Sequence, residues 1–363
     1  MTDSNVNLRV EKGVAEVVEV PMPRPNAEGF VVVRQEYAGI CTEQKSYASG
    51  FYEAHEGPLH MGHEGVGTIA EVGPGVSGLR EGDRVIVHIG WACGGCWVCR
   101  NGLTSTNCEN LGVARDMEEA NSMPSGSGGG AFNKYRLAPA FNVQKTPDSL
   151  DFRYARAANC LIGSTYSIVR DFDVGPQTHA LVAGVGFIGH AAIANLKHRG
   201  ATVIALGRNA ERLAIARELG VDAVVHPDDT DWLDQVRDLT PDGRGVDIAY
   251  ECSGHPDYQR KALDSLRRFG QLILMGYQRE TDWTFDIDVH DDILVPAKRI
   301  AGMEDLMIKH RGELGELLQQ QAMQQQIDTM IAGDAPLSDA AEVFEKILTR
   351  KHGKFFFRFD DLE

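Results

Sequence analysis

The chain has 363 residues, with 36 Lys and Arg against 52 Asp and Glu, and a formal net charge of −16. This length favours two domains, and the acidic balance without a visible basic patch argues against nucleic-acid binding. No apolar run reaches the length of a membrane span, and the N-terminus lacks a signal-peptide pattern, so we expect a cytoplasmic protein.

The first 150 residues are predicted to be rich in β-structure, because short apolar or alternating runs are broken by Gly and Pro. The predicted strands are 15–20, 29–36, 67–72, 83–88 and 133–137. Segment 110–130 ends in SGSGGG and is predicted to be a flexible surface loop.

From about residue 151 strands alternate with helices, which predicts an α/β unit with a parallel sheet and helices on both faces. Its predicted strands are 180–183, 202–206, 223–225, 246–250 and 272–275, and its predicted helices are 157–170, 189–199, 210–220, 231–238 and 258–269. The tail is predicted to form helices over 308–331 and 337–349 and a last strand over 354–359.

The run ALVAGVGFIG at 180–189 places GxGxxG between an apolar strand and a helix, which in this context indicates dinucleotide binding. Gly184 permits the tight turn, Gly186 lets the backbone approach the pyrophosphate, and Gly189 lets the helix pack closely on the strand. The helix N-terminus supplies N–H donors to the phosphates. The cofactor-binding residues predicted here are Gly184, Val185, Gly186, Phe187, Ile188 and Gly189.

The end of the next strand, ALGRN at 205–209, lacks the acidic residue that usually binds the ribose hydroxyls of NAD. The nearest acid, Glu211, already lies inside the next predicted helix. Gly207 leaves room where a carboxylate would sit, and Arg208 can face a 2′-phosphate, so we predict NADP in preference to NAD. In the alternative interpretation Arg208 is a solvated residue at a helix start. The further cofactor-binding residues predicted here are Gly207, Arg208, Asn209 and Arg212.

Six of the seven cysteines are arranged as two metal sites would require. The run CGGCWVCRNGLTSTNC has the spacing of a tetrahedral thiolate zinc site. Its cysteines are Cys93, Cys96, Cys99 and Cys108. Cys41 and Cys160 stand apart with His63 and Glu64 between them in sequence, and a Cys, His, Cys set can form an open catalytic site. Alternatively, His63 is a core histidine whose hydrogen bonds are satisfied, and Cys160 is a buried helix residue. The seventh cysteine, Cys252, is interpreted as a structural thiol.

With these motifs in order, the chain resembles the zinc-containing medium-chain alcohol, sorbitol and threonine dehydrogenases over nearly its whole length. The shared motifs are GHEGVGTIAEVG, GDRVIV, the cysteine run, GGAFNKY, the GxGxxG unit and the C-terminal LSDAAEVFEKI and GKFFF. The resemblance implies a GroES-like β-rich catalytic domain and a Rossmann domain with a doubly wound parallel sheet. We expect catalytic segments 1–155 and 295–363, a structural zinc lobe at about 90–110, a Rossmann domain at 156–294, and an active site between the domains.

The resemblance also implies the site roles. Cys41, His63 and Cys160 would hold a catalytic zinc, with Glu64 beside or ligating it, and the four-cysteine run would hold a structural zinc. An open position on the catalytic zinc suits Lewis-acid polarisation of an alcohol or carbonyl oxygen. The implied reaction is hydride transfer between NADP(H) and a secondary alcohol, polyol or sugar, or its carbonyl, in a homodimer or homotetramer.

The residues after Cys41 depart from the family pattern Cys-x-Ser/Thr-Asp-x-His. The run CTEQKS puts Glu43 where the proton-relaying hydroxyl is expected, and we favour Glu43 as the general base. Alternatively, Thr42 moves in through a local shift, or the enzyme reduces a conjugated C=C or C=N bond, for which the relay is dispensable. A last alternative is a relative that binds NADP without turnover, and the complete zinc triad argues against it.

Overall fold

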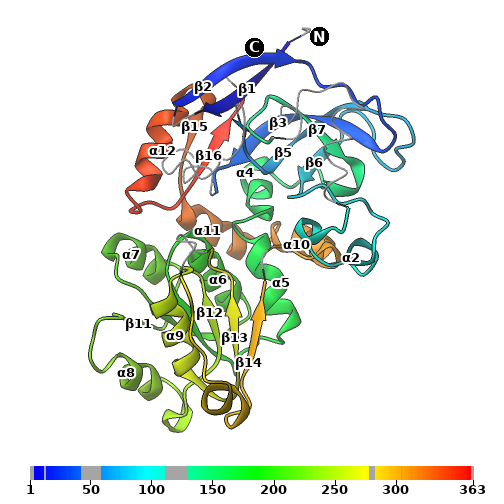
Figure 1. Ribbon diagram of the computed structural model, residues 1–363. Helices are drawn as coiled ribbons and strands as arrows, with labels where there is room; N and C mark the ends of the chain where they lie inside the picture. Colours follow the sequence, from blue (N-terminus) through cyan, green and yellow to red (C-terminus); the bar gives the residue numbers. More distant parts are fainter. Residues whose placement is uncertain are drawn as a thin grey trace. The chain divides into compact units, whose positions relative to one another are not determined.

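The computed structural model describes residues 4–11, 14–41, 59–110, 130–277, 283–303 and 305–360, and the chain divides into two compact units (Figure 1). Unit 1 comprises Met1–Gly163, Asp305–Gln324 and Ile331–Glu363, and unit 2 comprises Ser164–Glu304 and Gln325–Met330. The domain boundaries expected at 155 and 294 thus lie earlier in the chain than these unit boundaries.

Unit 1 is built on two β-sheets. The smaller has the order β2-β1-β4, and the larger has seven strands in the order β15-β16-β3-β5-β6-β8, with β7 also paired to β3. Strand β3 is central, because it pairs with β5, β7 and β16, and its valines 31–33 are buried. The strands are β1 Ser4–Glu11, β2 Val14–Pro21, β3 Phe30–Gly39, β4 Leu59–His60, β5 Glu64–Val72, β6 Arg84–Val87, β7 Tyr135–Pro139, β8 Val143–Lys145, β15 Ile331–Pro336 and β16 Lys354–Arg358.

Short helices connect and cover these sheets. They are α2 Trp97–Arg100, η1 Ser105–Asn107, η2 Ala140–Asn142, α4 Phe152–Ala155, η3 Arg156–Ala158, η6 Ile308–His310, α10 Arg311–Leu317, η7 Leu337–Asp339 and α12 Ala340–Leu348. Two further helices, α5 Gly163–Asp171 and α11 Gln321–Met330, span the sequence boundaries between the units.

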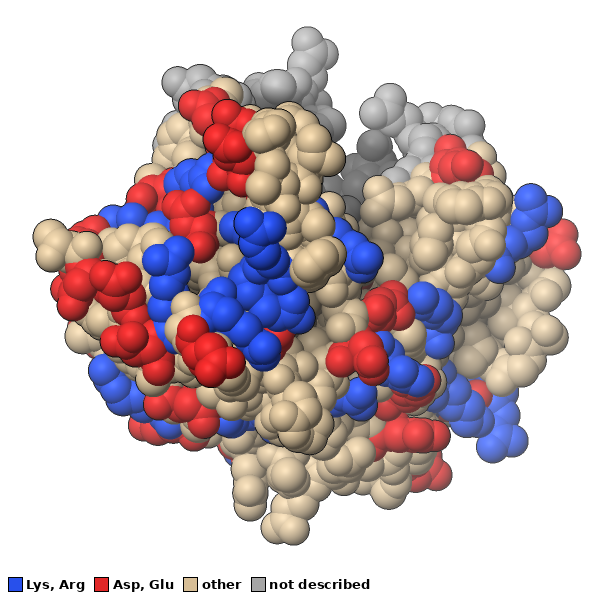
Figure 2. Space-filling model, turned by 90° about the horizontal axis from the view of Figure 1, so that it is seen from below, with Lys and Arg blue, Asp and Glu red and all other residues tan. Residues whose placement is uncertain are grey.

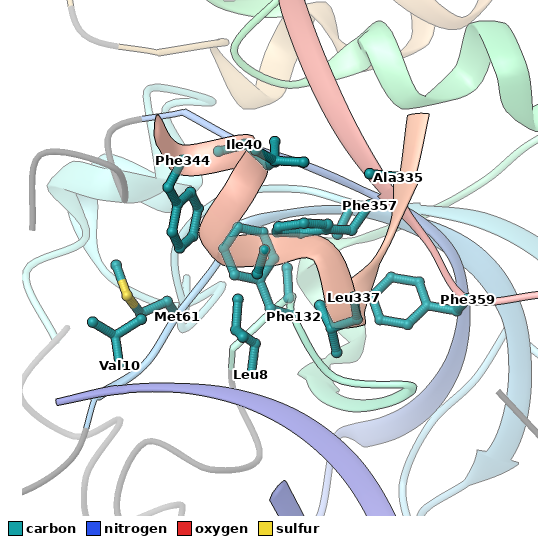
Figure 3. Close-up of a cluster of buried hydrophobic side chains, with 14 residues drawn as sticks. Leu8, Val10, Ile40, Met61, Phe132, Ala335, Leu337, Phe344, Phe357 and Phe359 are labelled. Atoms are coloured by element: carbon teal, nitrogen blue, oxygen red, sulfur yellow. The ribbon is translucent and has the colours of Figure 1, made fainter. Parts of the chain in front are cut away.

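An aromatic core holds both ends of the chain in unit 1. Figure 3 shows Leu8 from β1, Phe132, Phe344 from α12 and Phe357 from β16 packed together. The Phe357 ring meets those of Phe132 and Phe344 edge-on, with centroids 4.9 and 6.1 Å apart, a geometry that favours aromatic pairs. This packing holds β16 beside β3 and so delivers Lys354 to the site described below.

Unit 2 is a six-stranded parallel sheet in the order β11-β10-β9-β12-β13-β14. Helix α6 contacts the Val182 side of β9 through Gly189, whereas α9 packs in a cluster with Leu181 and Ala183. Successive strand residues point to opposite faces, so the two helices cover opposite faces of the sheet. The predicted doubly wound Rossmann architecture is thereby confirmed. The elements are β9 His179–Ala183, α6 Phe187–His198, β10 Thr202–Leu206, α7 Ala210–Glu218, β11 Ala223–Val225, α8 Trp232–Asp238, η4 Pro241–Gly243, β12 Val246–Glu251, α9 Pro256–Ser265, β13 Leu266–Leu274, η5 Val289–Leu294 and β14 Arg299–Gly302.

Three predicted helices differ from the structure. The helix expected at 157–170 is broken into η3 and α5, so Cys160 lies in the turn between them rather than on a helix. The helix expected to reach residue 269 ends at Ser265, because Leu266 turns to extended backbone and joins β13 beside β12. The helix expected over 308–331 is split into η6, α10 and α11, and at its end Ile331 pairs with Lys354 as the start of β15.

The described surface carries charges of both signs. Figure 2 shows acidic and basic side chains interspersed over the face seen there. Several form ion pairs in unit 2, such as Arg260 with Asp292 at 2.7 Å and Arg267 with Asp247 at 2.5 Å. Among the described residues, none of the helices combines the length and apolar character needed to cross a bilayer.

Candidate functional site

Three segments of unit 1 bring four metal-binding side chains together. Cys41 follows the end of β3, His63 and Glu64 stand at the start of β5, and Cys160 occupies the turn between η3 and α5. Their ligand atoms all lie within 4.8 Å of one another. The structure therefore assembles the set of residues that the sequence predicted for the catalytic metal, although Cys41 and Cys160 are far apart in the chain.

The spacing of this cluster fits a zinc ion. Cys160 Sγ lies 3.5 Å from His63 Nε2, and that nitrogen lies 3.8 Å from Glu64 Oε1. In a tetrahedral site with Zn–S bonds of about 2.3 Å and Zn–N bonds of about 2.1 Å, neighbouring ligand atoms stand about 3.5–3.8 Å apart. Cys41, Glu64 and Cys160 are buried, while the side chain of His63 is 30% exposed. One side of the cluster is thus the more open one.

A buried ion pair fixes one member of the cluster, Glu64. Lys354 Nζ lies 2.5 Å from Glu64 Oε1, and the two side chains are 0% and 1% exposed. In the register of β3 and β5, Glu64 is opposite Gly39, and a Cβ at Gly39 would collide with the Glu64 carboxylate. Glu64 Oε2 is buried without a hydrogen-bond partner, as expected of an oxygen available to a metal ion.

The electrostatics of the cluster favour the charged form of one cysteine and oppose that of the other and of Glu64. The hydrogen bond between the two thiols lowers the pKa of Cys41 well below its usual range and raises that of Cys160 well above it. Burial raises the pKa of Glu64, and the charge of Lys354 opposes this. For Lys354 burial acts against the charged form, but Glu64 and the two cysteines outweigh it and raise its pKa. The lysine thus offsets part of the negative charge that zinc ligands carry.

The predicted general base cannot be placed in this arrangement. Glu43, Thr42 and the polar residues that follow lie outside the described residues, which resume at Leu59. The proton route near Cys41 therefore remains a prediction from the sequence.

The second cluster joins the four cysteines of the predicted lobe. Cys93, Cys96, Cys99 and Cys108 have ligand atoms within 4.8 Å of one another, and Cys96 and Cys108 Sγ are 3.8 Å apart, the edge expected of a ZnS₄ tetrahedron. The lobe closes on itself through N–H···S bonds, including those from Cys96 N to Cys93 Sγ at 3.3 Å and from Cys99 N to Cys96 Sγ at 3.5 Å. The short helix η1 lies between Cys99 and Cys108 and ends just before Cys108.

The surroundings in the lobe shift the pKa values of its cysteines in opposite directions. Burial acts against ionisation of Cys93, but N–H bonds from Gly95 and Cys96 lower its pKa to about 6. Burial and the neighbouring Cys96 raise the pKa of Cys99 to about 12. A metal ion that takes four thiolates would have to displace protons here, which makes metal binding to this lobe dependent on pH.

In unit 2 the GxGxxG turn has the shape that the sequence predicts. Gly184 follows β9 with a φ of +96°, and Gly186 caps α6, which Phe187 opens. A Cβ at Gly189 would collide with the Gly184 carbonyl, so the helix can approach the strand only with glycine there. Val185 is buried beside the turn, and Ile188 lies in the first turn of α6.

The predicted selectivity residues follow β10. A Cβ at Gly207 would lie 2.6 Å from Val185 Cγ2, so this glycine is required by packing against the first turn. Arg208 is bound by Asp228 through three hydrogen bonds of 2.6–3.2 Å and lies 3.6 Å from Asp257. It is therefore an ion-paired residue at the carboxyl end of the sheet, where nucleotides bind open α/β sheets.

Asn209 and Arg212 occupy the start of α7. Asn209 Oδ1 accepts the Arg212 N–H at 2.9 Å and so caps the helix. Arg212 Nη1 lies 3.7 Å from the position of a Cβ on Gly186, so its guanidinium stands over the glycine turn. His190 Nε2 hydrogen-bonds the Arg212 carbonyl at 2.9 Å and fixes α7 to α6.

Comparison with known proteins decides the family. Residues 27–148 match the alcohol dehydrogenase GroES-like domain, and residues 188–318 match the zinc-binding dehydrogenase domain. The chain is a zinc-containing medium-chain dehydrogenase/reductase. An alcohol dehydrogenase of Geobacillus stearothermophilus is 32% identical over 340 residues, 92% of each chain. A sorbitol dehydrogenase of Halalkalibacterium halodurans is 30% identical, over 78% of this chain and 80% of the relative.

A solved structure agrees in fold. The alcohol dehydrogenase TADH from Thermus sp. ATN1 superposes with a TM-score of 0.84 over 97% of this chain and 99% of its own, at 24% identity. The predicted family and fold are thus confirmed, and this dehydrogenase is an oxidoreductase.

Sequence reasoning missed two residues of the dehydrogenase. Lys354 sits in the C-terminal GKFFF, 290 residues from its partner Glu64, and a lone lysine has no spacing that marks it. Asp228 follows β11, one strand beyond β10, after which NAD-binding proteins usually carry their acidic residue. Its pairing with Arg208 depends on the two strand ends meeting at one sheet edge, a rule that could have pointed to it.

Proposed function

We propose that this dehydrogenase transfers a hydride between NADP(H) and a secondary alcohol, polyol or sugar hydroxyl, or its carbonyl. The observation that carries the proposal is the convergence of Cys41, His63, Glu64 and Cys160 within 4.8 Å in a family of zinc-containing enzymes. The two curated relatives, named for alcohol and for sorbitol, support an alcohol or polyol substrate.

The proposed roles of the site residues are as follows. Cys41, His63 and Cys160 would hold a zinc ion, with Glu64 beside it, and bound zinc supplies Lewis-acid polarisation of an alcohol or carbonyl oxygen. Lys354 holds the Glu64 carboxyl in place and favours its charged form against the effect of burial. Glu43 would take the substrate proton as general base. The four-cysteine lobe would hold a second zinc that stabilises unit 1 without chemistry.

The preference for NADP rests on the edge of the parallel sheet in unit 2. No acid follows β10 directly, and Gly207 is held small by Val185. Arg208 and Arg212 put two guanidinium groups near the nucleotide turn, where a 2′-phosphate would sit. The charge of Arg208 is shared with Asp228, so NADP must compete with a carboxylate for it.

The assembly would be a homodimer or homotetramer. Strand β14 ends the sheet of unit 2, so its outer edge has no strand partner among the described residues. Val289 and Leu294, just before it in sequence, are 71% and 69% exposed. An unpaired edge flanked by exposed apolar side chains suits pairing with a second copy, which sedimentation velocity would detect.

The decisive test is a screen of alcohols, polyols and sugars with NADP and with NAD, with metal content measured on the same sample. We expect turnover with NADP and about two zinc ions per chain. In Cys41→Ser the metal content should fall to about one ion and turnover should be lost. A clear preference for NAD would overturn the cofactor proposal.

Two rival functions are separated by the same samples. A reductase of a conjugated C=C or C=N bond would return a product in which that bond is reduced and any carbonyl is kept. A relative that only binds the cofactor would show affinity for NADPH but no hydride transfer with any compound of the panel. For the base role, Glu43→Gln should cut turnover by roughly two orders of magnitude, and near-normal activity would refute it.

A further inference from the structure

A line of hydrogen bonds crosses the interior of unit 1 from the four-cysteine lobe to the turn that carries Cys160. All of its side chains except that of Gln144 belong to buried residues. Its members are Ser105, Arg311, Gln144, His88 and Asn159. None of them is a metal ligand in the clusters described above.

At the lobe, Arg311 clamps η1. Its Nη2 donates to Ser105 Oγ at 2.5 Å, and its Nη1 donates to the Phe141 carbonyl at 3.0 Å. The Ser105 carbonyl in turn accepts the N–H of Cys108 at 3.1 Å. The position of Arg311 is thus set by the same turn that positions a cysteine of the lobe.

In the middle, Gln144 links Arg311 to His88. Gln144 Nε2 donates to the Arg311 carbonyl at 2.9 Å, which leaves Gln144 Oε1 facing His88 Nε2 at 2.7 Å. Because an amide oxygen only accepts, His88 Nε2 must carry the proton. Burial, and then the charge of Arg311, lower the pKa of His88 well below its usual range, so the ring is neutral and its Nδ1 is an acceptor.

At the catalytic end, Asn159 completes the line. Its Nδ2 donates at 3.2 Å to the carbonyl of Val87, the residue before His88, and its side chain is close enough to His88 to act on the pKa of that ring. Asn159 leaves the helical conformation, with φ −90° and ψ −125°, at the break between η3 and α5. The next residue is Cys160, so the Asn159 side chain fixes the backbone from which that thiol projects.

Such a line is costly to bury, and the cost includes Arg311 Nε, which has no hydrogen-bond partner among the described residues, whereas apolar residues would fill the same space without that cost. We propose that His88 and Asn159 are positioning residues for the Sγ of Cys160. Through Gln144 and Arg311 they tie that position to the four-cysteine lobe. The inference rests on the proposed role of Cys160 as a zinc ligand.

The test compares two variants that each lose a buried polar group in unit 1. His88→Leu breaks the line, whereas Thr146→Val removes the bond from Thr146 Oγ1 to the Arg84 carbonyl at 3.1 Å and leaves the line intact. Zinc release to a chromogenic chelator resolves the two sites by rate. We expect His88→Leu to speed release from the Cys41 site roughly tenfold, and Thr146→Val to leave it unchanged. The thiolate-to-metal band of the cobalt-substituted catalytic site should shift only in His88→Leu.

Coupling to the lobe is tested by Ser105→Ala. If the line acts as a unit, the effects of Ser105→Ala and His88→Leu on catalytic-site release will be less than additive in the double variant. Additive effects would overturn the link to the lobe. If His88→Leu fails to fold, Gln144→Leu breaks the line at a half-buried residue and should speed release in the same direction.

Equal release rates in His88→Leu and Thr146→Val would overturn the positioning role. A wild-type protein that holds no metal at the Cys41 site would contradict the proposed function instead. The positioning role would then be read from the reaction of Cys160 with a thiol reagent, which should be faster in His88→Leu than in Thr146→Val, and equal rates would refute it.

Discussion

At the scale of single residues, Lys354 is costly to disturb. Its ammonium and the Glu64 carboxylate are both inaccessible to water, so each charge depends on the other. The ion pair keeps the Glu64 carboxylate beside Cys41 and Cys160. Without the lysine, repulsion between the carboxylate and the thiolates would oppose this arrangement. The contact between Lys354 and Glu64 therefore affects both the stability of unit 1 and the chemistry of the metal site.

Replacing Lys354 measures how much the ion pair contributes to stability. We expect Lys354→Met to lower the free energy of unfolding by about 3–5 kcal/mol, because it leaves the Glu64 charge buried without its partner. Urea unfolding of the metal-loaded protein measures this. The exposed pair of Lys346 with Glu342 is the control, and Lys346→Met should leave the free energy of unfolding nearly unchanged.

A second change sharpens this prediction. Adding Glu64→Gln to Lys354→Met should recover part of the loss, since no unpaired charge is then buried. An equal loss in Lys354→Met and Lys346→Met would show that the buried pair adds nothing to stability.

Residue by residue, the sequence predicts what is encoded by short spacing. The lobe cysteines lie within sixteen residues of the chain (93–108), and the GxGxxG turn within six (184–189), so local pattern suffices for both. Cys41 and Cys160 are predicted as partners only through their family context, because their proximity depends on the packing of β3 against the η3 segment. Lys354 had no local signal at all.

At the scale of elements, the proposed choice of NADP depends on the ends of β10 and β11. Arg208 follows the first strand and Asp228 the second, and the guanidinium holds the pKa of that carboxyl below its usual range. A 2′-phosphate would have to displace Asp228 from at least part of this fork.

Removing that competitor should improve binding of the phosphate. We expect Asp228→Asn to tighten the binding of 2′,5′-ADP by roughly two- to fivefold, the worth of an exposed ion pair, and to leave 5′-AMP unchanged. Calorimetric titration of both nucleotides measures this. Asp234→Asn on α8 removes the same charge from an exposed residue of the same unit and should change neither. An equal gain for both nucleotides would contradict a direct competition for Arg208.

Elements whose ends depend on distant partners were the ones that sequence reasoning misjudged. The helical pattern of α9 continues past Ser265, but parallel pairing with β12 claims Leu266 for β13. Likewise β15 begins at Ile331 because β16, far along the chain, is there to pair with it. Helix caps and periodicity say nothing about such partners.

At the scale of the whole molecule, stability depends on pH through groups that folding hides. His190 on α6 is buried, and burial lowers its pKa to about 4, although the bond to the Arg212 carbonyl opposes this. In the unfolded chain a histidine has a pKa of about 6.5. Between these values the unfolded chain binds the extra proton, so stability is lost as the pH falls from about 6.5 to 4.

The titration of His190 should give the free energy of unfolding a measurable dependence on pH. We expect unfolding free energy of the wild type to drop by up to about 3 kcal/mol more than that of His190→Gln across this window. Urea unfolding of both proteins at a series of pH values tests it. Asn195→Leu on the same helix breaks a buried hydrogen bond to Thr165 without removing a titrating group, and should be less stable but keep the wild-type slope.

The contact between Gly207 and Val185 has a consequence for engineering. An attempt to change the cofactor preference could start by placing an aspartate at position 207, yet its Cβ would lie 2.6 Å from a methyl group of the buried Val185. The substitution therefore needs a smaller residue at 185 as its companion. A variant library that changes one position at a time would miss the solution, and one that pairs 185 with 207 would contain it.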